Sequence, residues 1–218
     1  MRLYSNNICT EPTDRKWVCA LLASPNLGTV IDIGVGEEST ILVEYSEVFA
    51  SVIGFEPHRY AYNMIRPKTS VKDNITVYNT ALSSKQESVI FYSCTNNSGL
   101  SGVRKPRARE EFTTHILETM TLDDFPLNVS GKIDKIKIDA EGADVNILFG
   151  ARNTIIQHTP FIQIEHDAFN VGHDSLIELG YTEIIPPHPT NNRFYYHTRH
   201  HDLIHQNMID ITKKGETF

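Results

Sequence analysis

Acidic residues and glycines stand together at two points early in the sequence, each at the end of a short apolar run. Asp32, Gly34 and Gly36 end the first run, and Glu56 with Pro57 ends the second. Glycines let the backbone turn tightly and let a ligand approach without meeting a Cβ atom. A carboxylate at the place of Glu56 can accept hydrogen bonds from both hydroxyls of a ribose. This combination fits a cofactor that contains adenosine.

Two adenosine cofactors compete for this pattern. Gly34, Gly36 and Ser39, with Glu56 about 20 residues further on, imitate the dinucleotide fingerprint except that a serine replaces the third glycine. Asp32 favours S-adenosylmethionine (SAM) instead, because an acid beside the glycines would crowd a pyrophosphate but suits the positively charged methionine portion of SAM. The spacing therefore favours SAM over NAD and leaves both open.

A second group of candidate residues follows two later apolar runs. Asp139 and Glu141 come after one run, and Glu165 and His166 come at the end of the next. If a methyl group is transferred to a hydroxyl, that hydroxyl must lose a proton, which requires a general base. His166 is the first candidate because its unperturbed pKa of about 6.5 suits this role near neutral pH. Asp139, Glu141 and Asp167 are the alternatives.

The same residues also have structural interpretations. A histidine after a strand is often a hydrogen-bonding partner of its surroundings, and Asp139 or Glu141 can cap the next helix or pair with Lys137. Glu141 and the residues at 165–167 also form a candidate ligand set for a divalent metal. Because spacing alone does not define a coordination set, we predict no metal site.

One dense basic run, 104–109, begins with Arg104 and Lys105. Such a run is commonly a solvated surface, and two glutamates follow it directly. Its functional interpretation is the binding of an anionic acceptor, such as a phosphorylated or uronic sugar, by Arg104 and Lys105. The run lies in a polar stretch, 95–112, that is longer than ordinary connections, which indicates an insertion loop near the site.

Strands and helices alternate along the chain and must position these residues. Apolar runs predict strands at 29–34, 51–57, 74–82, 87–94, 133–139 and 160–165. Helical spacing predicts helices at 13–23 (a covering helix within 1–28), 38–49, 58–68, 144–157 and 175–179, and Thr121 is expected to cap a short helix. The segments 181–185 and 193–197 predict a closing antiparallel hairpin. This order predicts an α/β fold with a mostly parallel sheet and helices on both faces, and a ligand site at the carboxyl ends of the strands.

The composition describes a globular chain with an acidic balance. Its 218 residues include 27 acidic and 20 basic ones, for a net charge of −7, and 40% of them are hydrophobic. This length and apolar content fit a single domain over 1–218. The charge speaks against a nucleic-acid-coating protein. Without a signal peptide or a stretch of about 18–20 apolar residues, we expect a cytoplasmic protein with no membrane segment. The sequence leaves its oligomeric state open.

Seven segments, in sequence order, resemble the FkbM-type methyltransferase family. They lie at 30–34, 54–57, 80–82, 121–124, 135–144, 148–151 and 164–165, so the resemblance covers about residues 29–166. The most specific part is Leu-Asp-Asp at 122–124 followed by Lys-Ile-Asp-Ala-Glu-Gly-Ala at 137–143. The resemblance implies a SAM-dependent O-methyltransferase with the class I Rossmann-like fold, acting on a hydroxyl of a small molecule such as a sugar or natural product, or of a glycan.

The resemblance also implies roles for individual residues. Around the cofactor it implies Asp32, Gly34 and Gly36 near the methionine portion, Glu56 on the ribose, and Thr80, Ala81 and Leu82 near the adenine. Pro57 and Asp139 are further expected cofactor-binding residues. It implies that Asp139 and Glu141 face the transferred methyl group or the acceptor, with Glu165 and His166 at the end of the next strand. In the family's loop, Glu38 replaces a final glycine. This departure keeps open a catalytically inactive SAM-binding module, beside the alternative of an NAD-dependent oxidoreductase.

Overall fold

The order of the strands decides where a ligand site can lie. The computed structural model describes residues 11–22, 27–37, 40–94, 98–106, 111–129, 131–165, 171–188 and 190–214. Within these residues a seven-stranded sheet has the order β3-β2-β1-β7-β8-β10-β9, and a three-stranded sheet has the order β4-β6-β5. The strands are β1 (Leu27–Ile33), β2 (Phe49–Phe55), β3 (Ile75–Tyr78), β4 (Ala81–Leu82), β5 (Ser88–Cys94), β6 (Phe112–Met120), β7 (Ile133–Ile138), β8 (Phe161–Glu165), β9 (Tyr181–Ile184) and β10 (Asn192–His197). The helices are α1 (Glu11–Leu21), α2 (Thr40–Ser46), α3 (Arg59–Thr69), α4 (Asp144–Gly150), α5 (Arg152–His158), α6 (Val171–Glu178) and α7 (His201–Lys214), with short 3-10 turns η1 (Ser98–Leu100) and η2 (Thr198–His200).

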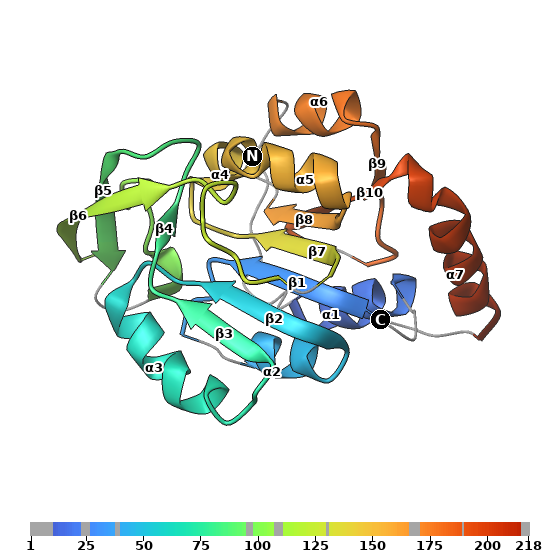
Figure 1. Cartoon of the computed structure of the whole chain (residues 1–218), viewed down its shortest axis with the longest axis horizontal. Helices are drawn as coiled ribbons and strands as arrows, with labels where there is room; N and C mark the ends of the chain where they lie inside the picture. Colours follow the sequence, from blue (N-terminus) through green and yellow to red (C-terminus); the bar gives the residue numbers. More distant parts are fainter. Residues whose placement is uncertain are drawn as a thin grey trace.

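Most of the larger sheet is parallel. Strands β3, β2, β1, β7 and β8 run in one direction, β10 is antiparallel to β8, and β9 is antiparallel to β10. The predicted mostly parallel α/β sheet with a C-terminal antiparallel hairpin is confirmed. Figure 1 shows the parallel strands pointing toward the end of the molecule that carries β5 and β6, with α7 at the opposite end. The carboxyl ends of the strands therefore face the smaller sheet.

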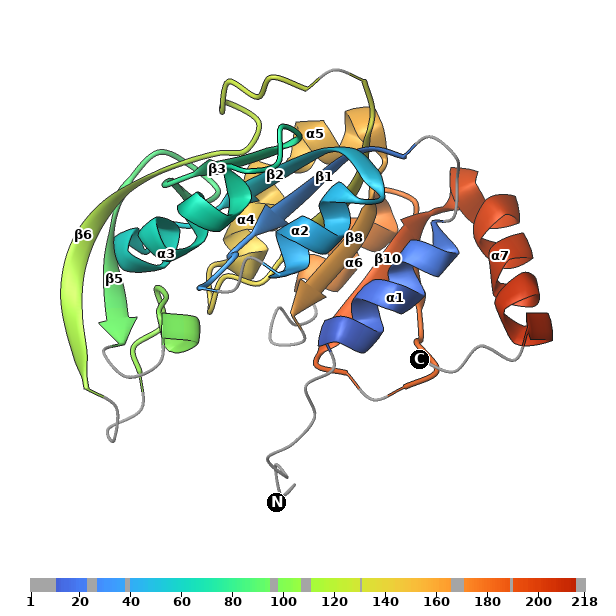
Figure 2. The same cartoon turned by 90° about the horizontal axis from the view of Figure 1, so that it is seen from below.

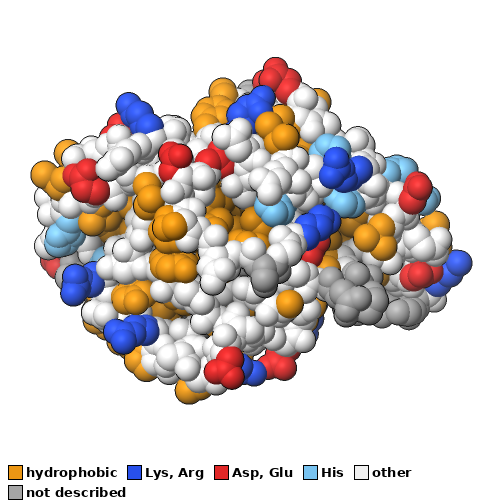
Figure 3. Space-filling view, in the orientation of Figure 1, with side chains coloured by type: hydrophobic (Ala, Val, Ile, Leu, Met, Phe, Trp, Pro, Cys, Tyr) orange, Lys and Arg blue, Asp and Glu red, His pale blue; other side chains and the backbone are white. Residues whose placement is uncertain are grey.

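Helices cover both faces of the larger sheet, as Figure 2 shows for α1 and α2 on one side and α4 and α5 on the other. Successive strand residues point to opposite faces. In β1, Val30 packs with the core under α1 and α2, whereas Ile31 and Ile33 pack with the core under α4 and α5. Burial of such a side chain contributes about 1.5–3 kcal/mol. Figure 3 shows one outer face, where apolar side chains gather toward the middle and charged ones lie around the margin.

Hydrogen bonds of Asp123 lie where the helix predicted over 144–157 divides into two. Its carboxylate accepts hydrogen bonds from the Asn153 and Thr154 N–H groups, both at 2.8 Å, which caps the start of α5. Its own N–H donates to the Gly150 carbonyl at the end of α4. The helix expected over 144–157 is therefore two helices that meet at residue 151, and the prediction of one continuous helix is wrong.

The short helix expected after Thr121 is also absent from the described chain. Residues 122–124 form a turn in which the Asp124 N–H donates to Thr121 Oγ1 at 2.9 Å. Thr121 thus makes the side-chain bond of a cap, but the chain does not continue as a helix. The residues after this turn lead to β7, and the Asp123 carboxylate caps α5.

Other differences concern the edges of the fold. The strand expected over 74–82 divides into β3, which pairs with β2, and β4, which pairs with β6. Strand β6 and helix α7 were not predicted, and the helix expected over 38–49 is described as α2, since Phe49 already belongs to β2. Among the described residues, no helix is long and apolar enough to cross a membrane.

Candidate functional site

A cavity of about 400 Å³ lies at the carboxyl ends of β1, β2 and β7. Its floor and one wall come from the larger sheet and α4, and the facing wall comes from β5, β6 and the loop after β5. Its described lining residues are Ile33, Gly34, Val35, Gly36, Glu37, Ile41, Glu56, Pro57, Thr80, Ala81, Leu82, Val89, Phe91, Gly99, Ser101, Val103, Thr119, Lys137, Asp139, Ala140, Glu141, Ala143 and Ile147. The cavity is where a parallel sheet places its ligands.

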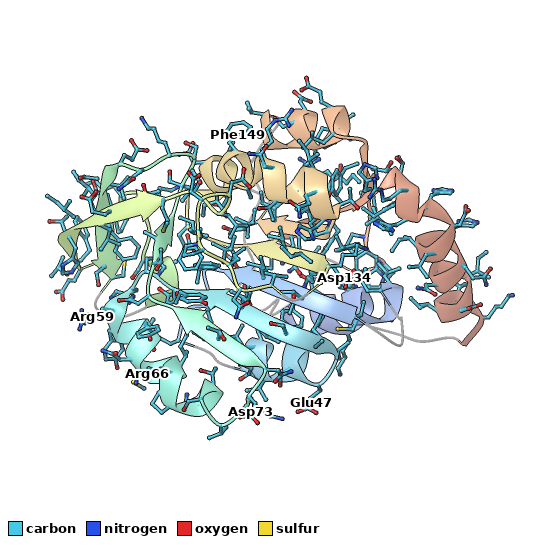
Figure 4. All side chains as sticks on the ribbon, in the orientation of Figure 1. Glu47, Arg59, Arg66, Asp73, Asp134 and Phe149 are labelled. Carbon is cyan, nitrogen blue, oxygen red and sulfur yellow. The ribbon has the colours of Figure 1, made fainter. Side chains whose placement is uncertain are left out.

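Different polar contacts lie at the amino ends of the parallel strands, opposite this cavity. Asp134, labelled in Figure 4 at the amino end of β7, accepts a hydrogen bond from the Gly28 N–H at 2.6 Å. A smaller cavity of about 130 Å³ also lies there, beside Asp134 and α7. The predicted site residues do not line this second cavity.

The glycine loop after β1 needs its two glycines for different reasons. Gly34 has a φ of 87°, and a Cβ atom on it would lie 1.7 Å from the Asp139 carbonyl oxygen. Gly36 has a φ of 69°, but a Cβ atom there would have no neighbour within 4 Å. Gly34 thus allows close packing against β7, while Gly36 leaves open space at the cavity. The open space beside the Cα atom of Gly36 can hold part of a bound ligand.

Glu56 joins the ends of β1 and β2. It is 5% exposed, and its carboxylate accepts hydrogen bonds from the N–H groups of Gly36 and His58, each at 2.7 Å. Burial raises the pKa of Glu56 to about 7, the two backbone hydrogen bonds oppose that change, and the charges of Asp32 and Glu37 add to it. Each carboxylate oxygen has two lone pairs, so Glu56 can hold the loop and still accept bonds from a ligand.

Asp32 lies behind the cavity and not in its wall. Its side chain is fully buried, and its Oδ1 lies 3.6 Å from Lys137 Nζ. The same ammonium lies 3.1 Å from Asp139 Oδ2, and Lys137 and Asp139 both line the cavity. Of the predicted cofactor residues, Asp32 alone is not among the lining residues, and Lys137 is a lining residue that sequence reasoning treated only as a pairing partner.

Three carboxylates form a cluster beyond the glycine loop. Oxygens of Asp139, Glu141 and Glu165 lie within 4.8 Å of one another. Such a cluster can accept a proton from an acceptor, accept hydrogen bonds from hydroxyls, or hold a divalent cation. His166 and Asp167, the other candidate bases, lie outside the described residues, as does Glu38.

The loop after β5 packs against Glu141 of this cluster. Gly102 packs so closely on Glu141 that a Cβ atom would lie 2.5 Å from the Glu141 Cβ, and the Arg104 N–H donates to the Glu141 carbonyl at 3.3 Å. The side chains of Arg104 and Lys105 are exposed, and neither residue lines the cavity. The predicted substrate residue Arg104 follows the lining residue Val103 and contacts Glu141, so it lies at the rim of the cavity, and Lys105 is the next residue along the chain. The rest of the basic run, 107–109, is outside the described residues.

Part of the cavity wall is mostly apolar. It includes the predicted residues Thr80, Ala81 and Leu82, together with Val89 and Phe91 from β5. Sequence reasoning did not select Val89 and Phe91, although their alternate positions in a strand predict one shared face. Such a surface suits a flat aromatic ring system.

Comparison with known proteins gives one family and a set of similar folds. A family model described as a methyltransferase FkbM domain matches residues 32–205. A crystal structure of methyltransferase FkbM from Methylobacillus flagellatus KT is similar, with 16% identity, a TM-score of 0.56, and coverage of 78% of this chain and 44% of that chain. This chain thus spans less than half of that protein.

Two further structures share the fold. The METTL16 MTase domain has 13% identity, a TM-score of 0.51, and coverage of 90% of this chain and 70% of that chain. Human methyltransferase 10 domain containing protein has 12% identity, a TM-score of 0.50, and coverage of 85% and 80%. A search of curated proteins finds no match. At these identities the structural likeness speaks for the fold alone.

Proposed function

Because the chain belongs to the FkbM methyltransferase family and uses SAM, we propose that it methylates a hydroxyl group on a sugar, a glycan or a natural product. The fold is that of the class I methyltransferases. The observation that carries the proposal is the carboxylate cluster of Asp139, Glu141 and Glu165, which adjoins the cavity at the carboxyl ends of the strands. Membership of a methyltransferase family speaks against the alternative of a nicotinamide-dependent oxidoreductase.

The cavity residues fit the parts of the cofactor. We assign the ribose hydroxyls to Glu56, beside Pro57, since a buried carboxylate at the end of β2 is a strong acceptor. The open space at Gly36, with Gly34 and Asp139 beside it, suits the methionine portion, and the mostly apolar part of the wall at 80–82 suits the adenine. Asp32 acts on this portion through Lys137. When bound, SAM supplies a methyl group on a positively charged sulfur.

The carboxylate cluster can orient a hydroxyl acceptor and remove its proton. Carboxylates accept hydrogen bonds from hydroxyls, so that two of them can orient an acceptor while the third takes its proton. The Asp139 carboxylate is already engaged, since it accepts a hydrogen bond from the Lys137 ammonium at 3.1 Å. We therefore propose Glu141 as the general base among the described residues, with Asp139 as a positioning group and His166 as the alternative base.

Recognition of the acceptor is proposed for Glu165 and the rim of the cavity. Glu165, the member of the cluster that ends β8, can accept hydrogen bonds from an acceptor's further hydroxyls. Arg104 and Lys105 at the rim can bind an acidic group on the same acceptor. The protein's task in the transfer is then geometric, because oxygen and methyl group must be held about 3–3.5 Å apart and in line.

A product analysis tests this proposal. The protein is incubated with SAM and a panel of sugars, glycans and polyketide-like alcohols, and S-adenosylhomocysteine is measured. The methylated product is then analysed by NMR, in which an O-methyl carbon is distinguished from an N-methyl or C-methyl carbon. We expect an O-methyl product, with turnover strongly reduced in Glu141→Gln. An N-methyl or C-methyl product would refute the hydroxyl acceptor, and SAM binding without turnover on any acceptor would favour the inactive module.

A further inference from the structure

Lys137 is the one cationic side chain among the cavity-lining residues that the structure describes. The charged residues beside it in the lining are the acids Glu37, Glu56, Asp139 and Glu141. The ammonium lies close to Asp32 and Asp139, as a buried charge requires opposite charge nearby. The question is which ligand group it could contact in addition to these acids.

The larger sheet fixes the position of this ammonium. Lys137 lies on β7 between Asp32 on β1 and Gln163 on β8, which are its direct neighbours in the two parallel pairings. Its side chain is 3% exposed, and Nζ lies 3.1 Å from Asp139 Oδ2 and 3.6 Å from Asp32 Oδ1. An ammonium has three donors. It can therefore hold Asp139 and a ligand carboxylate at the same time.

The charges of this group suit one end of SAM. Two carboxylates and one ammonium sum to one negative charge, and they lie beside the glycine loop. The methionine end of SAM carries a carboxylate together with an ammonium and the sulfonium. Its carboxylate matches Lys137, while its positive groups match Asp32, Asp139 and the other acids of the wall.

The distance between Glu56 and Lys137 across the sheet is also compatible with the length of SAM. Glu56 ends β2 and Lys137 lies on β7, and these strands flank β1 on either side. Neighbouring strands lie about 4.8 Å apart, so the two residues are separated by about 10 Å across the sheet. This span is comparable to the reach of SAM from its ribose hydroxyls to its carboxylate.

We propose that Lys137 binds the α-carboxylate of SAM and thereby fixes the methionine end of the cofactor against the glycine loop. The proposal rests on the use of SAM as cofactor and is independent of the acceptor. It assigns a cofactor-binding role to a residue whose other role is to hold Asp139. The same contact would orient the sulfonium toward the carboxylate cluster.

Lys135 provides a matched control on the same strand. It lies two residues earlier, faces the same side of the sheet and is fully buried. Its ammonium contacts the Tyr45 hydroxyl and lies 2.8 Å from Gln163 Oε1, and Lys135 does not line the cavity. A Lys135→Met variant therefore changes a buried lysine of β7 without changing the charge that the cavity presents.

The experiment compares two ligands that differ only in the carboxylate. Affinities for SAM and for decarboxylated SAM are measured by isothermal titration calorimetry on the wild type, Lys137→Met, Lys137→Arg and Lys135→Met. We expect the wild type to bind SAM about 10- to 100-fold more tightly than the decarboxylated form, as loss of a charge-assisted hydrogen bond implies. This ratio should fall to near 1 in Lys137→Met, stay above 1 in Lys137→Arg and be unchanged in Lys135→Met.

The outcomes separate the proposal from its premise. Equal affinity of the wild type for both ligands would overturn the role of Lys137, and this holds even if Lys137→Met does not fold. Equal weakening of both ligands by Lys137→Met would show a purely structural ion pair and would overturn it as well. Absence of SAM binding by the folded wild type would instead overturn the cofactor assignment and, with it, this proposal.

Discussion

The Gly36 N–H donates a 2.7 Å hydrogen bond to Glu56 Oε2, so the acid at the end of β2 holds the glycine loop at the end of β1. The second oxygen of Glu56 accepts from the His58 N–H. The residue proposed to bind the ribose is thus also the residue that shapes the loop. Under this proposal, cofactor binding and loop conformation are coupled through one carboxylate.

Removal of this carboxylate should reduce affinity for SAM. We expect Glu56→Ala to weaken binding by about 10- to 100-fold, since charge-assisted hydrogen bonds contribute about 1.5–3 kcal/mol each. Circular dichroism should show an unchanged fold. Glu47→Ala, at an exposed glutamate labelled in Figure 4, serves as the control and should bind SAM normally. Unchanged affinity in Glu56→Ala would exclude the ribose role.

The affinity for SAM should fall as the pH decreases below about 7. Burial raises the pKa of Glu56 to about 7 in the free protein. Ribose hydroxyls and the positive charge of SAM favour the ionised carboxylate, so binding below that pH must release a proton. Titration calorimetry should give a slope approaching about one log unit in affinity per pH unit, which levels off above pH 7. The slope should be smaller in Glu56→Gln, and identical profiles would contradict this.

The same pKa has a consequence for the stability of the free protein. Because the folded state binds this proton more tightly than the unfolded state, the contribution of Glu56 to stability decreases as the pH rises from about 4.5 to about 7. Above pH 7 both states are ionised and the contribution is constant. SAM should therefore stabilise the protein more at pH 8 than at pH 6, which a thermal shift series measures.

The two loop glycines should respond differently to alanine. Gly34→Ala places a Cβ atom against the Asp139 backbone and should lower the free energy of unfolding by about 3 kcal/mol or more. Gly36→Ala meets no protein atom and should lower it by only about 1 kcal/mol, from its positive φ. Its main effect should be on SAM affinity, because the new methyl group enters the cavity. Equal unfolding energies for the two variants would contradict this distinction.

The Asp123 carboxylate should stabilise the protein by capping the start of α5. Asp123→Ala removes the acceptor for the Asn153 and Thr154 N–H groups and should lower the free energy of unfolding by about 1–2 kcal/mol. For a chain of this size the melting temperature should fall by about 2–8 °C. Asp124→Ala, at the exposed neighbour, should change stability by less than about 0.5 kcal/mol. A similar loss in both variants would argue against capping.

Glu141 should affect turnover more than binding. We expect Glu141→Gln to lower kcat by about 10²- to 10⁴-fold, as loss of a general base does, with SAM affinity unchanged. Glu165→Gln should instead raise the KM for the acceptor. Because we predict no metal, turnover should persist in EDTA. Loss of activity in EDTA that Mg²⁺ or Mn²⁺ restores would reassign the carboxylate cluster as a metal site.

Short-range patterns predicted the central part of this fold and several of the residues that line the cavity. Buried strands such as β1 and β7 are continuous apolar runs, and the residues after them lie at one edge whatever the details of packing. This is why Gly34 and Glu56 could be selected from their positions alone, whereas Asp139 was selected with the help of the family resemblance. The division of 144–157 was not predictable in this way, because it depends on Asp123, which lies in a distant turn.

The remaining differences also come from long-range contacts. Strand β6 is mostly exposed, so its sequence lacks the apolar alternation of a half-buried strand, and it is defined by pairing with β5 over residues 112–118. Lys137 looks like a surface residue in the sequence. Only the neighbouring strand, which brings Asp32 to its side, explains why it is buried.

The cavity has walls from two separately hydrogen-bonded sheets. The larger sheet provides the glycine loop and Glu56, whereas β5 and β6 provide Val89, Phe91 and Thr119. A hairpin with its own ladder can be lengthened or exchanged without altering the register of the parallel strands. Exchange of this hairpin for that of another family member would therefore change the wall beside residues 80–82, and with it the fit of the proposed adenine site, while the glycine loop and Glu56 stay in place.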